Sequence, residues 1–200
     1  LMTAALLAKG GKKVLVVDQH YVAGGNATEF RRKGYVFDVG VHYVGDCEAD
    51  GKVPTLLREA GVEVKWLPMD PDGFDTFCFP DGMRFAYPRG VDRFEKRLLQ
   101  TFPGEAKGIR RYCRLLRGVW RLMQAGNRPL ALLKAVPSSW FALTSLGRTL
   151  EQVLDKCTHH PRLRAVLCGP IGAHGIAPSR VSALLHAGLV MHYLHKGGFY

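Results

Sequence analysis

The sequence lacks the signatures of several common enzyme and binding classes. It contains no C-x-x-C pair, no H-E-x-x-H motif and no G-x-S-x-G elbow, which argues against zinc sites, zincin proteases and α/β-hydrolases. Lys134 and Pro137 interrupt the stretch 129–146, so no run of about eighteen uncharged apolar residues exists and a membrane-spanning helix is not predicted. No metal site is predicted either.

Cysteine is also sparse. The five cysteines are odd in number and widely spaced, which does not indicate a disulfide framework and points to a reducing compartment. They are Cys47, Cys78, Cys113, Cys157 and Cys168. With 47% hydrophobic and 22% charged residues, the chain can nevertheless bury a sizeable core.

Acidic residues are scarce beside basic ones. The formal net charge is +11, and residues 93–134 hold eleven Lys and Arg against only Glu95 and Glu105. Within this segment, residues 104–125 predict an amphipathic helix with an apolar face and five arginines largely elsewhere. Such a helix either lies on an anionic bilayer or packs into a domain with a solvated basic face. No nucleic-acid reading motif accompanies the charge, so a nucleic-acid partner is not predicted.

The first residues have the pattern of an interrupted βαβ unit. Residues 1–9 resemble the second half of an amphipathic helix that ends at Gly10-Gly11. The run 12–20 that follows is rich in valine, which is typical of a strand buried on both faces of a parallel sheet. No basic region precedes the apolar residues, so a signal peptide is not indicated, and we expect the true N-terminus to lie before Leu1.

The remaining pattern predicts two hairpins followed by helices. A hairpin or two short strands, with Gly34 at a turn, are expected within 31–46, and a second hairpin at 74–87 turns at Pro80-Asp81-Gly82. A short helix at 53–61 and a strand at 62–67 lie between them. Beyond a composition shift near residue 90, helices are predicted at 91–101, 104–125, 129–136, 148–157, 160–168 and 178–195.

A compound motif follows the first predicted strand. In a Rossmann-type domain the second strand ends in a carboxylate that accepts hydrogen bonds from ribose hydroxyls, and Asp18 lies at that position. The pair Gly24-Gly25 follows six residues later, where glycine lets backbone N–H groups approach a phosphate. Gly40 then lies in a D-x-G step. The order of strand, acid, glycine pair and hairpin predicts a dinucleotide site.

These residues carry a family resemblance. The stretch VLVVDQHYVAGGNATEFRRKGYVFDVGVHYVGD, residues 14–46, resembles the flavin-binding segment of the phytoene desaturase, carotenoid isomerase and retinol saturase family of FAD enzymes. Residues 174–200 resemble the helix that leads into a glycine-rich return to the flavin, which favours the retinol saturase-like branch. The chain is therefore expected to be a fragment that lacks the first glycine loop and the C-terminal half.

The resemblance implies an α/β fold with two domains. A partial Rossmann-type FAD-binding domain is expected at 1–68. An α+β, mostly helical substrate domain is expected at 69–200, and it returns toward the flavin near 197–200. By the same resemblance, Asp18 would hold the adenosine ribose.

The resemblance also assigns the rest of the cofactor site. Gly24 and Gly25 would approach the pyrophosphate and ribityl region of FAD, and Gly40 with His42 would lie along the flavin. His42 is the sole catalytic candidate, and its alternative is a hydrogen-bonded core residue. Many relatives have Arg where this sequence has Asn26, which donates hydrogen bonds without adding charge.

The implied activity is flavin hydride chemistry on a carotenoid- or retinoid-like polyene, by saturation, desaturation or isomerisation. NAD(P) is a candidate electron partner. A polyene stored in lipid favours peripheral membrane contact through residues 104–146 and a cytoplasmic or peripherally membrane-associated protein. Two alternatives stay open within the fold: a flavin amine oxidase-like enzyme and a flavin-free prenyl-lipid-binding escort protein, although the glycines disfavour the latter.

Two further interpretations concern histidines outside this motif. His174 is interpreted as a loop residue, with a substrate channel as the alternative. On the last predicted helix, Leu185 and His192 are placed on the apolar face, so His192 is interpreted as a packed core residue.

Overall fold

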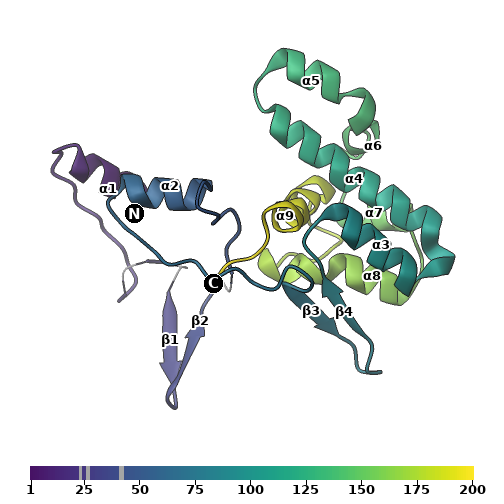
Figure 1. Cartoon of the computed structure of the whole chain (residues 1–200), viewed down its shortest axis with the longest axis horizontal. Coiled ribbons are helices and arrows are strands. Elements are labelled where there is room, and N and C mark those ends of the chain that lie inside the picture. The colour runs from purple at the N-terminus through teal and green to yellow at the C-terminus, as the bar shows by residue number, and fades with distance from the viewer. Residues whose placement is uncertain (23, 26–27, 41–42) are drawn as a thin grey trace. The chain divides into compact units, whose positions relative to one another are not determined.

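The structure is a computed structural model that describes residues 1–200 apart from residues 23, 26, 27, 41 and 42. The chain divides into two compact units (Figure 1). Unit 1 comprises residues 1–69 and 198–200, and unit 2 comprises residues 70–197.

Two short helices pack together in unit 1. Helix α1, Met2–Lys9, ends where Gly11 adopts a φ of 78° and Lys12 N–H donates to the Leu7 carbonyl at 3.0 Å. This Gly-Gly stop confirms the predicted helix end. Helix α2, Lys52–Glu59, packs against α1, and the Lys9 ammonium donates to the Glu59 carbonyl at 2.5 Å.

A two-stranded antiparallel hairpin completes the regular structure described in unit 1. Strand β1, Glu29–Arg32, pairs with β2, Tyr35–Asp38. Lys33 and Gly34 form the two-residue turn with φ of 51° and 83°, as the twist of a tight hairpin requires. The predicted hairpin is confirmed.

The predicted strand at 12–20 is wrong in this structure. Residues 12–18 have no regular secondary structure, and Leu15 and Val17 are almost fully exposed rather than buried. A parallel strand exists only where a neighbouring strand pairs with its backbone, and no described residue does so here. The strand predicted at 62–67 is likewise absent, apart from a single bridge at Pro68.

The chain's last three residues close unit 1. Phe199 bridges both Val44 and Pro68, and Leu67 exchanges backbone hydrogen bonds with Tyr200 at 2.8 and 2.9 Å. Phe199 is buried by these contacts. Segments that are far apart in sequence are thus joined by backbone pairing.

Unit 2 opens with a second hairpin and continues with helices. Strands β3, Asp75–Cys78, and β4, Arg84–Tyr87, pair antiparallel, and the predicted turn is confirmed because Gly82 has a φ of 84° and the Asp81 carboxylate accepts from Met83 N–H at 3.2 Å. The helical elements are α3 (Val91–Thr101), η1 (Pro103–Glu105), α4 (Ala106–Ala125), α5 (Pro129–Ala135), η2 (Pro137–Ser139), α6 (Trp140–Leu143), α7 (Leu150–Asp155), α8 (Pro161–Cys168), η3 (Gly169–Ala173) and α9 (Ala183–Lys196).

Helix α4 is the centre of unit 2. Helices α3, α5, α6 and α9 all pack against it (Figure 1). Its predicted apolar face is confirmed at Ile109, Tyr112 and Leu116, which are fully buried, whereas Met123 in the last turn remains 53% exposed. Most of the apolar face of α4 is therefore buried in the core of unit 2.

The buried face of α9 differs from the prediction. Leu185 is 56% exposed and His192 is only partly buried, whereas His186 is fully buried. The reason is close packing: a Cβ placed on Gly188 would lie 3.9 Å from Val119 and 3.3 Å from the Met123 sulfur, both on α4. The small residues of α9 face α4, and Leu185 points outward.

Candidate functional site

Two of the predicted site residues, Asp18 and Gly25, line a hollow in unit 1. The hollow has a volume of about 440 Å³. It is lined by Asp18, Gln19, His20, Tyr21, Gly25, Thr28, Glu29, Phe30 and Val39. Two segments that flank the glycine pair therefore form its walls.

Asp18 is held at the wall by a local turn. Its Oδ1 accepts a hydrogen bond from the His20 backbone N–H at 2.9 Å. The His20 ring stacks on Tyr21 at 4.6 Å between centroids, and its Nδ1 accepts from the Val22 N–H at 3.3 Å. The carboxylate remains at the surface, where it can accept hydrogen bonds from hydroxyl groups.

The backbone conformation at positions 24 and 25 favours glycine. Gly24 and Gly25 have φ of 126° and 59°, a region that other residues rarely adopt. A Cβ added to Gly25 would meet no atom of the described residues beyond its chain neighbours within 4 Å, although this residue lines the hollow. The open space beside this backbone suits the close approach of a ligand phosphate to N–H groups.

The hairpin supplies the opposite wall. Val39 N–H donates to the Thr28 carbonyl at 3.0 Å and extends the β1–β2 pairing up to the hollow. Gly40 follows Val39 and is exposed. Asn26 and His42, the other two predicted site residues, lie outside the described residues. The structure thus brings Asp18 and Gly25 together, with Gly24 and Gly40 adjacent.

Sequence reasoning missed several residues that line the hollow. Among them, His20, Tyr21 and Phe30 contribute rings, and Glu29 contributes a second carboxylate that binds Arg31 at 3.0 Å. Their closeness to the glycine pair in the sequence could have identified them as candidates. None of the described lining residues is Lys or Arg, so a phosphate here depends on backbone N–H donors. The arrangement suits hydroxyl and ring recognition.

Unit 2 contains a separate buried polar network. His186 shares a hydrogen bond between its Nε2 and the Leu167 carbonyl at 3.0 Å, and His174 Nε2 lies 3.2 Å from its Nδ1. The Tyr87 hydroxyl donates to the Val166 carbonyl beside it. Burial lowers the pKa of His186 to about 4, so this ring is neutral at pH 7. His186 and Tyr87 thereby satisfy carbonyls at the end of α8, and His174 contacts this network through His186.

Three fully or partly buried cysteines are poor nucleophiles. Burial raises the pKa of Cys47 and of Cys157 to about 11, and it raises the pKa of Cys113 as well. Their thiols stay protonated at neutral pH. In the described part of the chain, no three His, Cys, Asp or Glu side chains lie in positions to hold a metal ion.

Comparison with known proteins begins at the same end of the chain. Residues 1–60 match a family described as an NAD(P)-binding Rossmann-like domain. This range includes every predicted site residue. The match, together with the mixed helices and strands, supports an α/β fold with a dinucleotide-binding segment.

The chain is also similar to curated proteins along its whole length. It is 33% identical to an all-trans-retinol 13,14-reductase of Danio rerio over 99% of this chain and 36% of that protein. It is 32% identical to the human protein of the same name over 100% of this chain and 35% of that protein. A lycopene-forming phytoene desaturase of Pantoea ananas is 26% identical over 94% of this chain and 39% of that protein. The chain spans about a third of the length of these relatives.

Proposed function

The chain belongs to the family of retinol saturases, carotenoid isomerases and phytoene desaturases, and from this premise we propose that it forms part of an FAD-dependent oxidoreductase acting on a retinoid- or carotenoid-like polyene. The observation that carries the proposal is the 33% identity to a retinol 13,14-reductase over 99% of the chain. Saturation is the reaction we favour, because the reductases match more of the chain than the isomerases do.

The hollow in unit 1 is our candidate for the adenosine and pyrophosphate part of FAD. Asp18 would accept hydrogen bonds from the ribose hydroxyls, and the N–H groups around Gly24 and Gly25 would face the phosphates. Gly40 would lie further along the cofactor, with Asn26 and His42 as additional proposed contacts. The fit rests on the exposed carboxylate and on the open space beside Gly25.

Bound FAD would supply hydride transfer to or from a carbon of the conjugated chain. The residues of this chain would supply position and hydrogen bonds rather than acids and bases. His20 and Tyr21, already stacked on each other, present a ring surface at the wall that Asp18 occupies. NAD(P) is our candidate electron partner for the whole protein.

We propose that the two units have different functions. We assign FAD binding to unit 1, because the hollow and the Rossmann-like match both lie there. We assign the substrate to unit 2, a mostly helical body with its own core. Peripheral membrane contact through residues 104–146 is part of the proposal. Among the described residues, no helix is both long and apolar enough to cross a bilayer.

The first test is the flavin content of the full-length protein. Denaturation of the purified protein should release FAD in near-equal molar amount, read from its absorbance bands. Anaerobic mixing with all-trans-retinol and with carotenoids, followed by product analysis, then tests the substrate. A colourless protein that cannot be reconstituted with FAD would overturn the proposal.

Two matched glycine variants test whether FAD binds at the hollow. Gly25→Ala and Gly61→Ala both place a side chain at a left-handed backbone position with no neighbouring atom within 4 Å, and each costs about 1–2 kcal/mol of conformational strain. Only Gly25 lines the hollow. We expect FAD affinity to fall about tenfold or more in Gly25→Ala alone. Equal losses in both variants would show that strain, and not the site, is responsible.

A matched carboxylate pair tests ribose recognition. Asp18→Asn should weaken FAD binding by roughly tenfold, because a charge-assisted hydrogen bond contributes about 1.5–3 kcal/mol. Asp50→Asn changes an exposed acid of the same unit that does not line the hollow and should leave affinity unchanged. Titration of the apoprotein with FAD, followed by flavin fluorescence, measures both.

A further inference from the structure

A group of large apolar side chains is exposed at one end of unit 2. They lie between the last turn of α4 and the start of α7, in a segment that we call the tip, residues 121–148 (Figure 1). Met123, Leu130, Leu133, Trp140 and Leu146 have exposed fractions of 53, 75, 70, 66 and 63%. Several large apolar side chains exposed within one short segment indicate a surface that meets a partner or a membrane.

The tip is anchored to α4 by close packing. A Cβ on Gly118 would lie 3.1 Å from that of Ala142 and 3.3 Å from the Cα of Ser139, so the backbones nearly touch. The Ser139 hydroxyl donates to the Gly118 carbonyl at 3.1 Å, and Arg121 donates to the Ser138 carbonyl at 3.1 Å. The fold itself therefore holds the leucines of the tip at the surface.

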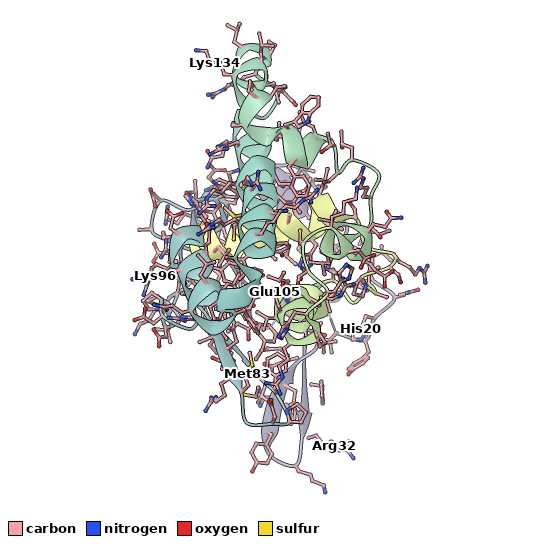
Figure 2. All side chains as sticks on the ribbon, turned by 90° about the vertical axis from the view of Figure 1, so that its right-hand side faces the viewer. His20, Arg32, Met83, Lys96, Glu105 and Lys134 are labelled. Atoms are coloured by element: carbon pink, nitrogen blue, oxygen red, sulfur yellow. The ribbon has the colours of Figure 1, made fainter. Side chains whose placement is uncertain are left out.

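The charge around the tip has one sign. Residues 106–150 contain nine Lys and Arg and no Asp or Glu. Four of them flank the exposed apolar groups: Arg121, Arg128, Lys134 and Arg148, and Figure 2 shows Lys134 at the far end of the segment. Leucines and a tryptophan beside basic side chains match the interface of an anionic bilayer, where aromatic rings and cations sit at headgroup depth.

The long basic helix itself is not available for this role. Its apolar residues Ile109, Tyr112 and Leu116 are fully buried in the core of unit 2. Arg117 is bound to Glu95 at 2.6 Å within the same unit. A helix can lie on a bilayer only with its apolar face turned toward the lipid, so α4 cannot do so while unit 2 is folded.

We propose that the tip inserts Leu130, Leu133 and Trp140 into the surface of an anionic bilayer, with Arg128 and Lys134 at the level of the lipid phosphates. The choice of lipid over a protein partner rests on the one-signed charge and, through the proposed function, on a polyene substrate that partitions into membranes. The contact is thereby assigned to the end of the 104–146 segment rather than to its long helix.

The principal experiment is flotation of the full-length protein with vesicles. We expect binding to vesicles that contain phosphatidylserine and much weaker binding to phosphatidylcholine alone. The double variant Leu130→Ser/Leu133→Ser should bind at least about tenfold more weakly. Leu185→Ser, which changes an exposed leucine on α9, is the matched control and should bind as the wild type does. Unchanged binding of the double variant, or an equal loss in the control, would overturn the proposal.

A charge comparison separates the tip from the helix. Arg128→Gln/Lys134→Gln should weaken binding to phosphatidylserine vesicles by about thirtyfold, because each basic residue near the surface contributes about 1 kcal/mol. Arg110→Gln/Arg114→Gln removes two exposed charges of α4 and should have little effect. The reverse order would show that the face of α4 makes the contact and that the proposal is wrong.

Tryptophan fluorescence reports insertion independently of the flavin. Trp140 is 66% exposed, so its emission should shift to shorter wavelength on vesicle binding. Trp140→Phe should keep most of the binding and lose the shift, and a shift that persists in this variant would contradict insertion at the tip. Flavin content measured on the same preparations shows whether a failure belongs to the cofactor site or to the tip.

Discussion

The two units differ in how much of their own apolar surface they bury. Among the described residues, nearly all buried apolar side chains belong to unit 2, and the exceptions in unit 1 are Cys47, Pro54 and Phe199. In unit 1 the valines of 14–17 and the rings of Phe30, Tyr35 and Phe37 are exposed. Because apolar burial is the main source of folding free energy, unit 2 carries its own stability and unit 1 has little of its own.

The largest expected effect is a cavity in the core of unit 2. Phe94 is fully buried against Phe85 and Tyr87, so Phe94→Ala should lower the free energy of unfolding by about 3–5 kcal/mol. Phe37→Ala, at an exposed ring in unit 1, should cost less than about 1 kcal/mol. Urea unfolding followed by circular dichroism measures both. Similar losses in the two variants would break the contrast between the units.

The second effect is acid sensitivity of unit 2. The unfolded chain binds a proton on His186 near pH 6.5, whereas burial lowers the folded pKa to about 4. Stability is therefore full above about pH 6.5 and is lost as the pH falls toward 4, by roughly 3 kcal/mol in all. Unfolding free energies measured across this pH range test the prediction.

Two histidine variants test whether His186 causes this pH dependence. His186→Gln should flatten the pH dependence between 6.5 and 4. His159→Gln, at an exposed position of the same unit, should leave it as in the wild type. A slope that survives in His186→Gln would assign the acid sensitivity to another group, with the neighbouring His174 as the first candidate.

The smallest expected effect concerns how the helices start. Helix α7 has a full capping box between Thr149 and Gln152, whereas α1 and α2 of unit 1 have no side-chain cap. Thr149→Ala should cost about 1 kcal/mol, because it removes the acceptor of a helix N–H group. Thr144→Ala, at the C-cap of α6, removes a hydroxyl that donates to the Phe141 carbonyl rather than a side-chain acceptor for helix N–H groups, and it should stay within about 0.5 kcal/mol. Thermal melts compare the two, and equal costs would show that the cap adds nothing.

The fold of unit 2 was easier to predict from the sequence than the fold of unit 1. Most helices and the hairpin of unit 2 were predicted close to their observed bounds, because Gly and Pro stops and the 3.6-residue pattern are local signals. The last helix begins at Ala183 rather than at 178, and the short elements η2, α6 and η3 were not predicted. The strand at 12–20 was predicted wrongly, because strand formation depends on a neighbour that the local pattern does not contain. The glycine pair was identified from the sequence. The positions of the His20 and Tyr21 rings in the wall of the hollow became known only from the structure.

The sequence by itself indicated the family, most helices, both hairpins and the position of the Asp18 and Gly24-Gly25 motif, since these depend largely on residues close together in the chain. Tertiary structure alone decided which side of α9 is buried. It placed His186 rather than His192 in the core and left Leu130, Leu133 and Trp140 at the surface. The physical reason is that burial depends on which distant element packs against a residue, and small residues such as Gly118 and Gly188 set that packing by allowing backbones to approach.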